Sequence, residues 1–328
     1  MLTKTLIKSF IFASIGLSLI HCRHSKNTVL EESDTVHLKN YLELDKIELG
    51  RKLFFDKRLS SDETVSCSSC HLPEMAFTDG LRVSIGVEGR KTERNSPSIL
   101  NSKDLPTVMF DGHLPTLEQQ VIVPIQEHVE MNMNMLDLIS KLKAIPEYSK
   151  AAKKCFNRDF DPWVLTRAIS AFERSLISKN SPFDQFYFNN DTDAISNSAK
   201  RGWKIFSEDL YCTKCHPAPN FTTYETINNG LYLDYGTDKG RFRIFNDSSD
   251  IGKFKIPSLR NITLTVPYMH DGSKTTLKDV IEHYKKGGES HRLKDERITS
   301  FSLSDDQERD LLEFFSSLVD TSYIVDFK

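Results

Sequence analysis

The chain has 328 residues, with 43 basic and 46 acidic side chains and a formal net charge of −3. Without residues 1–21 it would lose two lysines and no acids, which leaves 41 basic and 46 acidic residues and a formal charge of −5. This mildly acidic balance excludes a nucleic-acid-binding protein. The length is sufficient for two domains with separate cores.

The N-terminal segment predicts export. Two lysines are followed by an uncharged run over 9–20 and then by Cys22. Such a run is too short to cross a bilayer, so we interpret residues 1–21 as a secretory signal and expect a periplasmic or otherwise exported protein. Leu19 precedes Cys22 by three positions, as in lipoprotein signals, whereas His21 stands where a small residue is usual. A lipid anchor on Cys22, giving a membrane tether, and an ordinary cleaved signal therefore both stay open.

The remainder divides into a tether and a mostly helical body. Residues 22–44 are mainly polar and charged and are expected to form the tether. Within the body, the apolar spacing over 161–178 predicts a long amphipathic helix, with Leu165, Ile169 and Phe172 on one face. Loops rich in Gly, Pro, Asn and Asp separate such segments, so the fold is expected to be mainly α.

Two copies of the pattern C-x-x-C-H dominate the chemistry, CSSCH at 67–71 and CTKCH at 212–216. In a zinc ribbon the two cysteine pairs lie about 15–20 residues apart, whereas 141 residues separate the two cysteine pairs of this chain. Covalent c-type haem explains them better. Cys67 and Cys70 would attach one haem and Cys212 and Cys215 the other, and the iron ligands would be His71 and His216. Cys155 remains as a buried thiol.

An internal duplication accompanies the two motifs. PSILN at 97–101 corresponds to PSLRN at 257–261, and DGHLPTL at 111–117 corresponds to DGSKTTL at 271–277, both with an offset of 160 residues. This order predicts two cytochrome c-like domains with one haem each. We place the N-terminal haem domain at 45–190 and the C-terminal one at 191–328.

The second copy contains a candidate iron ligand. Thr276 and Asp279 form a capping box, and apolar spacing places Tyr284 on the inner face of the helix that begins at Leu277, with His283 at the flank. We predict that Tyr284 ligates the second haem iron. A tyrosine at this spacing is often only a core residue, and Met269 and His270 are rival ligands.

In the first copy, the residue that corresponds to Tyr284 is Pro124, which cannot bind iron. The first haem is therefore predicted to keep an open coordination site, and such a site favours peroxide or dioxygen as ligand. Gln120 lies on the inner face of the same helix and Glu130 follows it. The alternatives are that Gln120 caps a turn and that Glu130 lies on a solvated surface.

With these residues the sequence resembles the bacterial dihaem cytochrome c peroxidase family, and within it the MauG-like branch. The resemblance extends from about residue 45 to 320. It rests on the motifs AFTDG (76–80), VSIGVEGR (83–90), RNSPS (94–98), GKFKIPSLRN (252–261) and TVPYMHDG (265–272).

The resemblance implies distal roles at the first haem for Gln120, Pro124 and Glu130. Many peroxidases of the family have a histidine that caps this haem at the position of Val87, so its replacement implies a site that needs no reductive activation. The methionine ligand of those peroxidases corresponds to Tyr284, the residue type that MauG-like members carry.

The resemblance also implies one calcium ion between the haems. Its ligands would be Asn95, Thr265 and Pro267, the last two through backbone carbonyls, which suits a hard cation. Two positions depart from the family pattern. Phe110 replaces a tryptophan between the haems, and only Tyr211 stands just before the second haem motif. Both departures weaken the expectation of electron hopping through indole side chains.

These features predict a peroxidase-type oxidoreductase that reduces hydrogen peroxide at the first haem. Gln120 would hold the peroxide and Glu130 would carry a proton between its oxygens, with a raised pKa from apolar surroundings. Phenolate ligation by Tyr284 stabilises high oxidation states, which favours storage of an oxidising equivalent.

Three hypotheses follow from this chemistry. The first is a MauG-like oxidase that modifies a partner protein. The second is a cytochrome c peroxidase that removes peroxide with electrons from a small cytochrome or another redox protein. The third is an electron-transfer cytochrome without enzymatic activity. The sequence pattern carries no signal for an oligomeric state.

Overall fold

The computed structural model describes residues 32–327. The predicted signal at 1–21 and Cys22 lie outside the described residues. The chain divides into two units, 1–39 and 40–328, and the candidate site lies in the second. Within the described part, no helix has the length and hydrophobicity needed to cross a membrane.

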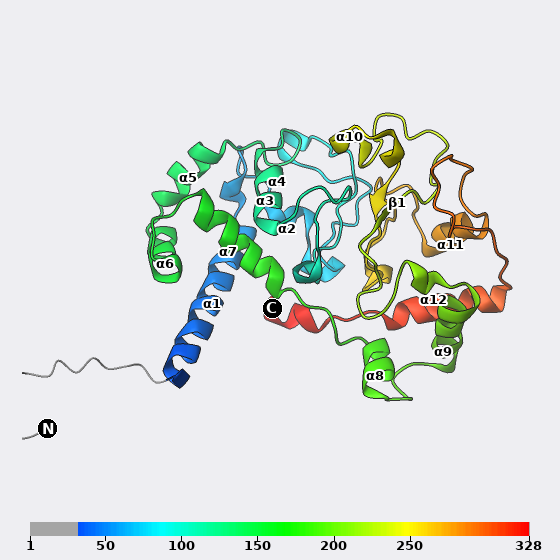
Figure 1. The fold of residues 1–328 in the computed structure, drawn as a ribbon. Helices are drawn as coiled ribbons and strands as arrows, with labels where there is room; N and C mark the ends of the chain where they lie inside the picture. Colours follow the sequence, from blue (N-terminus) through cyan, green and yellow to red (C-terminus); the bar gives the residue numbers. More distant parts are fainter. Residues whose placement is uncertain (1–31, 328) are drawn as a thin grey trace, which may run out of the picture. The chain divides into compact units, whose positions relative to one another are not determined.

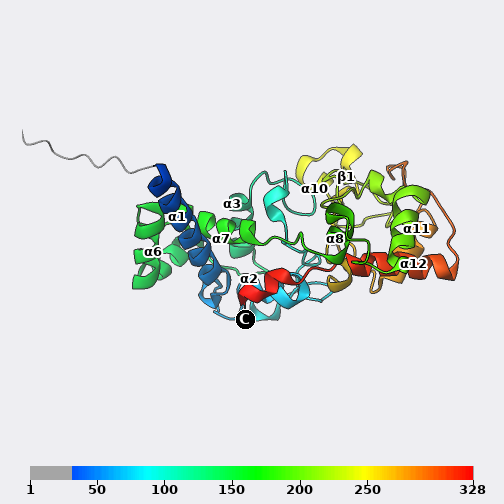
Figure 2. The same cartoon turned by 90° about the horizontal axis from the view of Figure 1, so that it is seen from below.

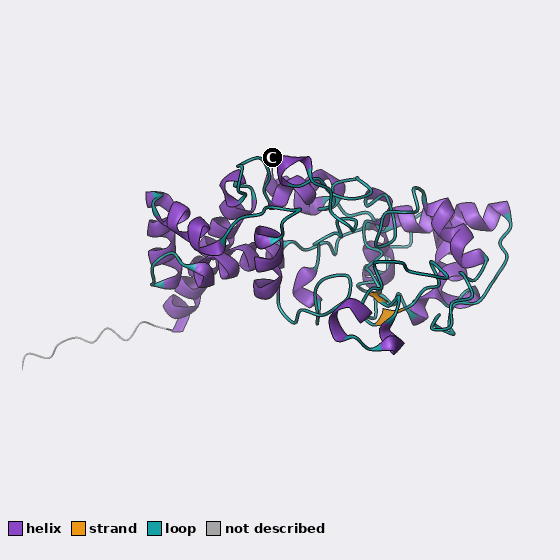
Figure 3. Cartoon of the chain, turned by 90° about the horizontal axis from the view of Figure 1, so that it is seen from above, coloured by secondary structure: helices purple, strands orange, loops and turns teal. Residues whose placement is uncertain are grey.

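The fold is mainly α, as predicted, with helices joined by long loops (Figures 1 and 3). The helices up to residue 175 are α1 (Glu32–Phe54), α2 (Cys67–Cys70), α3 (Leu117–Gln120), α4 (Ile122–Gln126), α5 (Met135–Lys143), α6 (Pro146–Phe156) and α7 (Pro162–Ser175). Those that follow are α8 (Pro182–Asn189), α9 (Asn197–Lys204), α10 (Phe242–Phe245), α11 (Leu277–Lys285) and α12 (Asp305–Ser317). Strands β1 (Thr226–Ile227) and β2 (Phe254–Lys255) form one short antiparallel pair, with Thr226 opposite Lys255.

Two predicted helices are present, although the one expected over 161–178 already ends at Ser175. In α7, the Asp161 side chain accepts a hydrogen bond from the backbone N–H of Val164, and Pro162 occupies the first turn. In α11, Thr276 and Asp279 form the predicted capping box. Residues 32–44, the last part of the predicted tether, belong to helix α1. They include Leu38, Leu42 and Glu43, residue types that favour helix.

The two halves repeat the same helix crossing. A Cβ on Gly50 of α1 would lie 1.9 Å from the carbonyl oxygen of Ala168 in α7, and a Cβ on Gly202 of α9 would lie 1.9 Å from that of Asp310 in α12. Both glycines therefore let two helix backbones touch. Figure 2 shows α1 beside α7, and Figure 1 shows α9 beside α12.

The segments with the 160-residue offset also share local geometry. Met109 and Met269 both have positive φ, 72° and 73°. The isolated bridge between Val108 and Leu114 recurs between Tyr268 and Lys274. The duplication seen in the sequence is thus repeated in the backbone.

Buried hydrophobic side chains form two large clusters. The first includes Phe54, Phe77 and Phe172 around α1 and α7. The second includes Phe206 and Phe314 around α9 and α12. Each cluster lies beside one C-x-x-C-H motif, since Cys67 packs against the first and Cys212 against the second.

Two segments of the chain pack in the hydrophobic cluster of the opposite half. Phe183 of α8 lies before residue 190 but packs in the second cluster, where Asp184 and Arg260 form a buried ion pair with an N–O distance of 2.7 Å. Tyr323, near the C-terminus, packs in the first cluster. The chain end therefore returns to the N-terminal half.

Candidate functional site

The first C-x-x-C-H motif folds as the short helix α2 with its histidine just beyond the end. Ser66 and Ser69 form a capping box that starts the helix. The Nδ1 atom of His71 lies 2.9 Å from the carbonyl oxygen of Phe77, to which it can donate. That hydrogen bond orients the ring and leaves Nε2 as the metal-binding atom.

The second motif reproduces this arrangement. Cys212–Lys214 form a short 3-10 turn, and Nδ1 of His216 lies 2.8 Å from the carbonyl oxygen of Phe221. Burial lowers the pKa of His216 to about 4, which keeps the imidazole neutral, the form that binds metal. Phe77 and Phe221 both have positive φ, so the two acceptor loops turn in the same way.

The residues of both motifs fit covalent haem. All four cysteines are free thiols beside an oriented histidine, and none is used in a disulfide. The haem irons and the thioether bonds would be held by the residues that the sequence singled out. Cys155, as expected, is a buried free thiol in α6.

Gln120 and Pro124 lie on either side of the junction between helices α3 and α4. Thr116 caps α3, which ends at Gln120, and Pro124 follows in α4. The carbonyl oxygen of Pro124 accepts from the backbone N–H of Met131 at 3.1 Å. This hydrogen bond folds the chain back and brings Glu130 towards the same region.

Glu130 lies close enough to the first cysteine pair for its charge to act on both thiols. Burial, with the nearby charge of Glu127, raises the pKa of Glu130 to about 7. Burial also raises the pKa of the Cys67 and Cys70 thiols, and the Glu130 charge contributes to both. Glu130 is partly buried rather than fully solvated.

Val87 is packed directly against the backbone of Glu130. It is fully buried, and its N–H donates to the carbonyl oxygen of Glu130 at 2.8 Å. The preceding Gly86 permits this approach, since a Cβ there would lie 2.1 Å from the carbonyl oxygen of Val129. An aliphatic side chain thus fills the position of the family's capping histidine.

Tyr284 lies within electrostatic reach of the second cysteine pair. Burial raises the pKa of its phenol, a hydrogen bond from the Asn229 amide lowers it, and Cys215 and Cys212 raise it further. The same amide also donates to the sulfur of Met269 at 3.5 Å. Tyr284 and Met269 therefore both lie beside Asn229.

The two histidines of this region have other partners. His270 stacks on Phe254, with ring centroids 3.7 Å apart. His283, predicted at the flank of the inner helix face, is buried, and its Nε2 lies 3.1 Å from the carbonyl oxygen of Asn229. It thereby fixes the segment that carries the Asn229 amide.

The two segments that carry the residues expected to bind calcium contact each other. The backbone N–H of Asn95 donates to the carbonyl oxygen of His270 at 2.8 Å, so the first-half loop touches the 265–270 loop of the second half. The Asn95 amide donates to the carbonyl oxygen of Leu81, and the Thr265 hydroxyl donates to that of Ile262. Among the described residues, no group of three or more His, Cys, Asp or Glu side chains forms a metal cluster.

The sequence analysis did not predict a network of ion pairs that joins the two halves of the chain. Arg94 donates to both oxygens of Asp111 at 3.0 Å and to both oxygens of Asp238 at 2.7 Å. A small aromatic cluster lies beside it and includes Tyr235, Phe254 and, at its edge, Phe110. The motifs RNSPS, DGHLPTL and GKFKIPSLRN lie in this region, but none of them indicated the ion pairs.

Glu173 was also missed. It lies on α7 in the first cluster, is 5% exposed, and burial raises its pKa to about 8. Its Oε2 atom has no hydrogen-bond partner among the described residues. A lone acid on an otherwise apolar helix face is the sequence signal that could have identified it.

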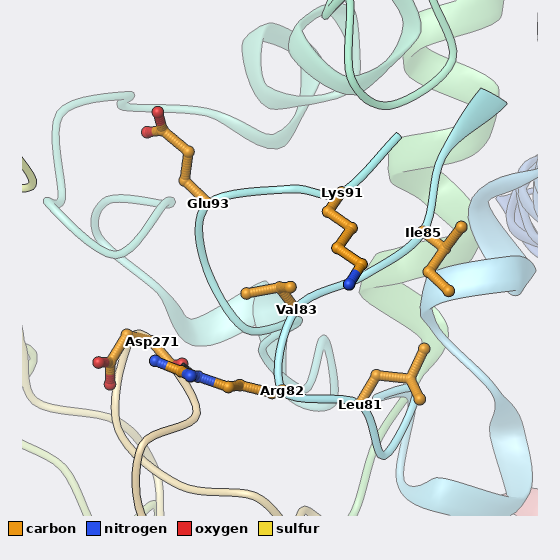
Figure 4. Close-up of a pocket in the computed structure, with 7 residues that line it drawn as sticks. All are labelled: Leu81, Arg82, Val83, Ile85, Lys91, Glu93 and Asp271. Carbon is orange, nitrogen blue, oxygen red and sulfur yellow. Dashed lines mark hydrogen bonds between the residues drawn. The ribbon is translucent and has the colours of Figure 1, made fainter. Parts of the chain in front are cut away.

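A surface pocket of about 450 Å³ lies where the two halves meet. Figure 4 shows apolar side chains from the 81–85 segment and charged ones around them. Its lining residues are Leu81, Arg82, Val83, Ile85, Lys91, Glu93 and Asp271.

Comparison with known proteins agrees with this arrangement. The sequence profile described as "Di-haem cytochrome c peroxidase" matches residues 44–193. The methylamine utilization protein MauG of Methylophilus methylotrophus is 36% identical over 286 residues, which cover 86% of this chain and 84% of that protein. The cytochrome c551 peroxidase of Pseudomonas aeruginosa is 37% identical over 246 residues, covering 71% of this chain and 70% of the relative.

A solved structure is also similar. A MauG-like protein associated with microbial copper homeostasis superposes with a TM-score of 0.80 at 35% sequence identity. The match covers 85% of this chain and 91% of that one.

Proposed function

Because the chain belongs to the di-haem cytochrome c peroxidase family, we propose that it is a MauG-like oxidase, which uses hydrogen peroxide to oxidise a partner protein. The family establishes a peroxide-dependent dihaem oxidoreductase with two c-type haems and a redox-protein partner. The proposal adds which haem site reduces peroxide and which one stores the oxidising equivalent. It also adds that the substrate is a partner protein.

The observation that carries the proposal is the difference between the two copies. The first has Pro124 where the second has Tyr284, and only the first places a buried carboxyl with a pKa near neutrality beside its cysteines. We assign Cys67, Cys70 and His71 to the peroxide-reducing haem, and Cys212, Cys215 and His216 to the other. Each haem supplies an iron that changes oxidation state.

At the first site the protein's own residues bind peroxide and move its proton. The Gln120 amide holds the peroxide by hydrogen bonding. The Glu130 carboxylate takes the proton from one peroxide oxygen and delivers it to the other, so that water can leave. Val87 keeps this side apolar and supplies no ligand, which supports a site that is open without prior reduction.

At the second site Tyr284 is the proposed iron ligand. The Asn229 amide stabilises the phenolate by donating a hydrogen bond to its oxygen, and an anionic ligand favours the higher oxidation states. Met269 is the alternative ligand, because its sulfur lies beside the same amide. His270 is disfavoured by its stacking on Phe254.

The remaining assignments extend the same account. The two haem domains are proposed at 45–190 and 191–328, after a signal at 1–21 and a segment at 22–44. A calcium ion is proposed at Asn95, Thr265 and Pro267. The protein is proposed to be periplasmic, with either lipid attachment at Cys22 or a cleaved signal.

A second candidate function is a cytochrome c peroxidase that removes hydrogen peroxide. The 37% identity to a cytochrome c551 peroxidase favours it. In this case the electrons would come from a small cytochrome rather than from a protein that is modified.

The experiment that separates these functions is a peroxide reaction followed by addition of a donor. The ferric protein is mixed with one equivalent of peroxide, and then with reduced cytochrome c. A long-lived oxidised state that reacts slowly with the cytochrome supports the oxidase, and rapid saturable turnover selects the peroxidase. No spectral response to peroxide would contradict both and leave a simple electron-transfer cytochrome.

A further inference from the structure

The second half contains a hydrogen-bonded tyrosine that the account above does not use. The phenol of Tyr232 donates to Oδ2 of Asp271 at 2.6 Å. The backbone N–H of Ser273 donates to the other carboxylate oxygen at 3.1 Å. Both carboxylate oxygens therefore accept hydrogen bonds, and Oδ2 is the atom that faces the phenol proton of Tyr232.

This pair departs from the duplicated pattern. Asp271 corresponds to Asp111 of the first half, whose two oxygens are both taken by the guanidinium of Arg94. A carboxylate paired with a guanidinium is a poor proton acceptor, because protonation would break the ion pair. In the second half a phenol takes the place of that cation.

Tyr232 is connected to the proposed ligand of the second haem. The Tyr232 ring lies 5.8 Å from that of Tyr235, in an edge-to-face arrangement. Tyr235 in turn lies within electrostatic range of Tyr284. Two consecutive asparagines hold this series, since Asn228 accepts from the Tyr235 phenol at 2.9 Å and Asn229 binds the Tyr284 phenol.

Tyr232 and Tyr235 differ in the group that accepts the hydrogen bond of their phenol. A phenol that loses an electron becomes a strong acid, so its proton has to move to a nearby base. Tyr235 donates to an amide oxygen, which is a very weak base. Tyr232 donates to a carboxylate, so only there can the proton leave with the electron.

We propose that Tyr232, with Asp271 as its proton acceptor, is a relay residue that stores an oxidising equivalent as a tyrosyl radical. This inference rests on the proposed function, because the reduction of one peroxide to water withdraws two electrons from the protein. One of them comes from Tyr232: its O–H bond breaks, the electron passes through Tyr235 towards the second haem site, and the proton moves to Oδ2 of Asp271. An external one-electron donor later reduces the radical, and the proton returns.

The position of Asp271 gives this relay an outlet. The same residue lines the surface pocket of Figure 4, together with Arg82, whose Nε donates to the backbone carbonyl of Asp271 at 3.3 Å. The oxidising equivalent on Tyr232 thus lies next to a residue that lines a surface pocket. Phe110 is not required for this route, so the loss of the family's tryptophan does not block it.

The test uses the protein with both haems, labelled with ring-deuterated tyrosine. Ferric samples receive one equivalent of hydrogen peroxide without reductant and are frozen at increasing times. Electron paramagnetic resonance then detects the radical, and optical spectra of the same samples follow the haems. We expect a tyrosyl signal whose hyperfine structure collapses on deuteration.

Three variants identify the residue. Tyr232→Phe keeps the ring and should lose the signal, and Asp271→Asn should lose most of it because an amide cannot take the proton. Tyr148→Phe is the matched control. Tyr148 also donates to a carboxylate, that of Asp56, but Arg58 already pairs with both oxygens there, so the signal should stay unchanged.

The outcomes separate the two proposals. If peroxide changes the haem spectra but Tyr232→Phe or Asp271→Asn gives the wild-type radical yield, the relay is wrong and the proposed function stands. If the haem spectra do not respond to peroxide, the proposed function is wrong, and the relay with it.

Discussion

Replacement of Glu130 by Gln tests the proposed proton transfer most sharply. The change keeps the size of the side chain and its hydrogen-bonding reach but removes the group that gains and loses a proton. General acid–base catalysis by one positioned group typically contributes about 10²–10⁴-fold. We therefore expect the second-order rate constant for peroxide to fall by that factor.

The pH dependence follows from the raised pKa of Glu130. With a pKa of about 7, the carboxyl is neutral below neutrality and ionised above it. The ionised fraction rises roughly tenfold from about pH 6 to about pH 8. Because the carboxylate has to accept the peroxide proton, the rate should rise with pH over this window, whereas a glutamate with an ordinary pKa would give a flat profile.

Glu127 provides a matched change. Its negative charge contributes to the raised pKa of Glu130, so Glu127→Gln should move the midpoint of the profile to lower pH and keep its height. Stopped-flow absorbance of the ferric protein with excess peroxide measures all three profiles. A Glu130→Gln rate equal to that of the wild type, with the same pH midpoint, would refute the proton-transfer role.

Three further changes have defined outcomes. Tyr284→Met should alter the optical and paramagnetic signals of the second haem only and raise its reduction potential; unchanged spectra would exclude Tyr284 as a ligand. Asp184→Asn should destabilise the fold by about 3–5 kcal/mol, because the charge of Arg260 stays buried without its partner; denaturant titration measures this, and a cost near zero would contradict it. In the wild type, burial raises the pKa of Asp184, but its hydrogen bonds and the Arg260 charge lower it below the ordinary value. The stabilisation by the ion pair is therefore present above about pH 4 and should be lost as the pH falls through the folded-state pKa. Gly50→Ala should cost about 1–3 kcal/mol, since the new methyl group would lie 1.9 Å from the carbonyl oxygen of Ala168; an unchanged denaturation midpoint would show that the helix crossing can relax.

Local signals in the sequence predicted much of the structure. The capping box of Thr276 and Asp279 was correct because it depends on four neighbouring residues only. The two haem motifs were recognisable for the same reason, as each keeps its cysteines and histidine within five positions. The duplication was visible because two short motifs kept one offset.

The rest depends on contacts between distant segments. The burial of His283 follows from the carbonyl oxygen of Asn229, 54 residues away in sequence. The contact between Val87 and Glu130 requires Gly86 to let two loops approach. The pairing of Tyr232 with Asp271 has no local pattern at all, since it depends on how a loop folds over the duplicated motif. Only the folded chain brings these groups together.

The central claim is that one haem site is open and the other is closed by a tyrosine. Electron paramagnetic resonance of the ferric protein as isolated, repeated after one equivalent of peroxide, tests it directly. The account predicts one high-spin five-coordinate signal and one low-spin signal, with the high-spin signal lost on reaction with peroxide. Two low-spin six-coordinate signals that peroxide leaves unchanged would contradict it.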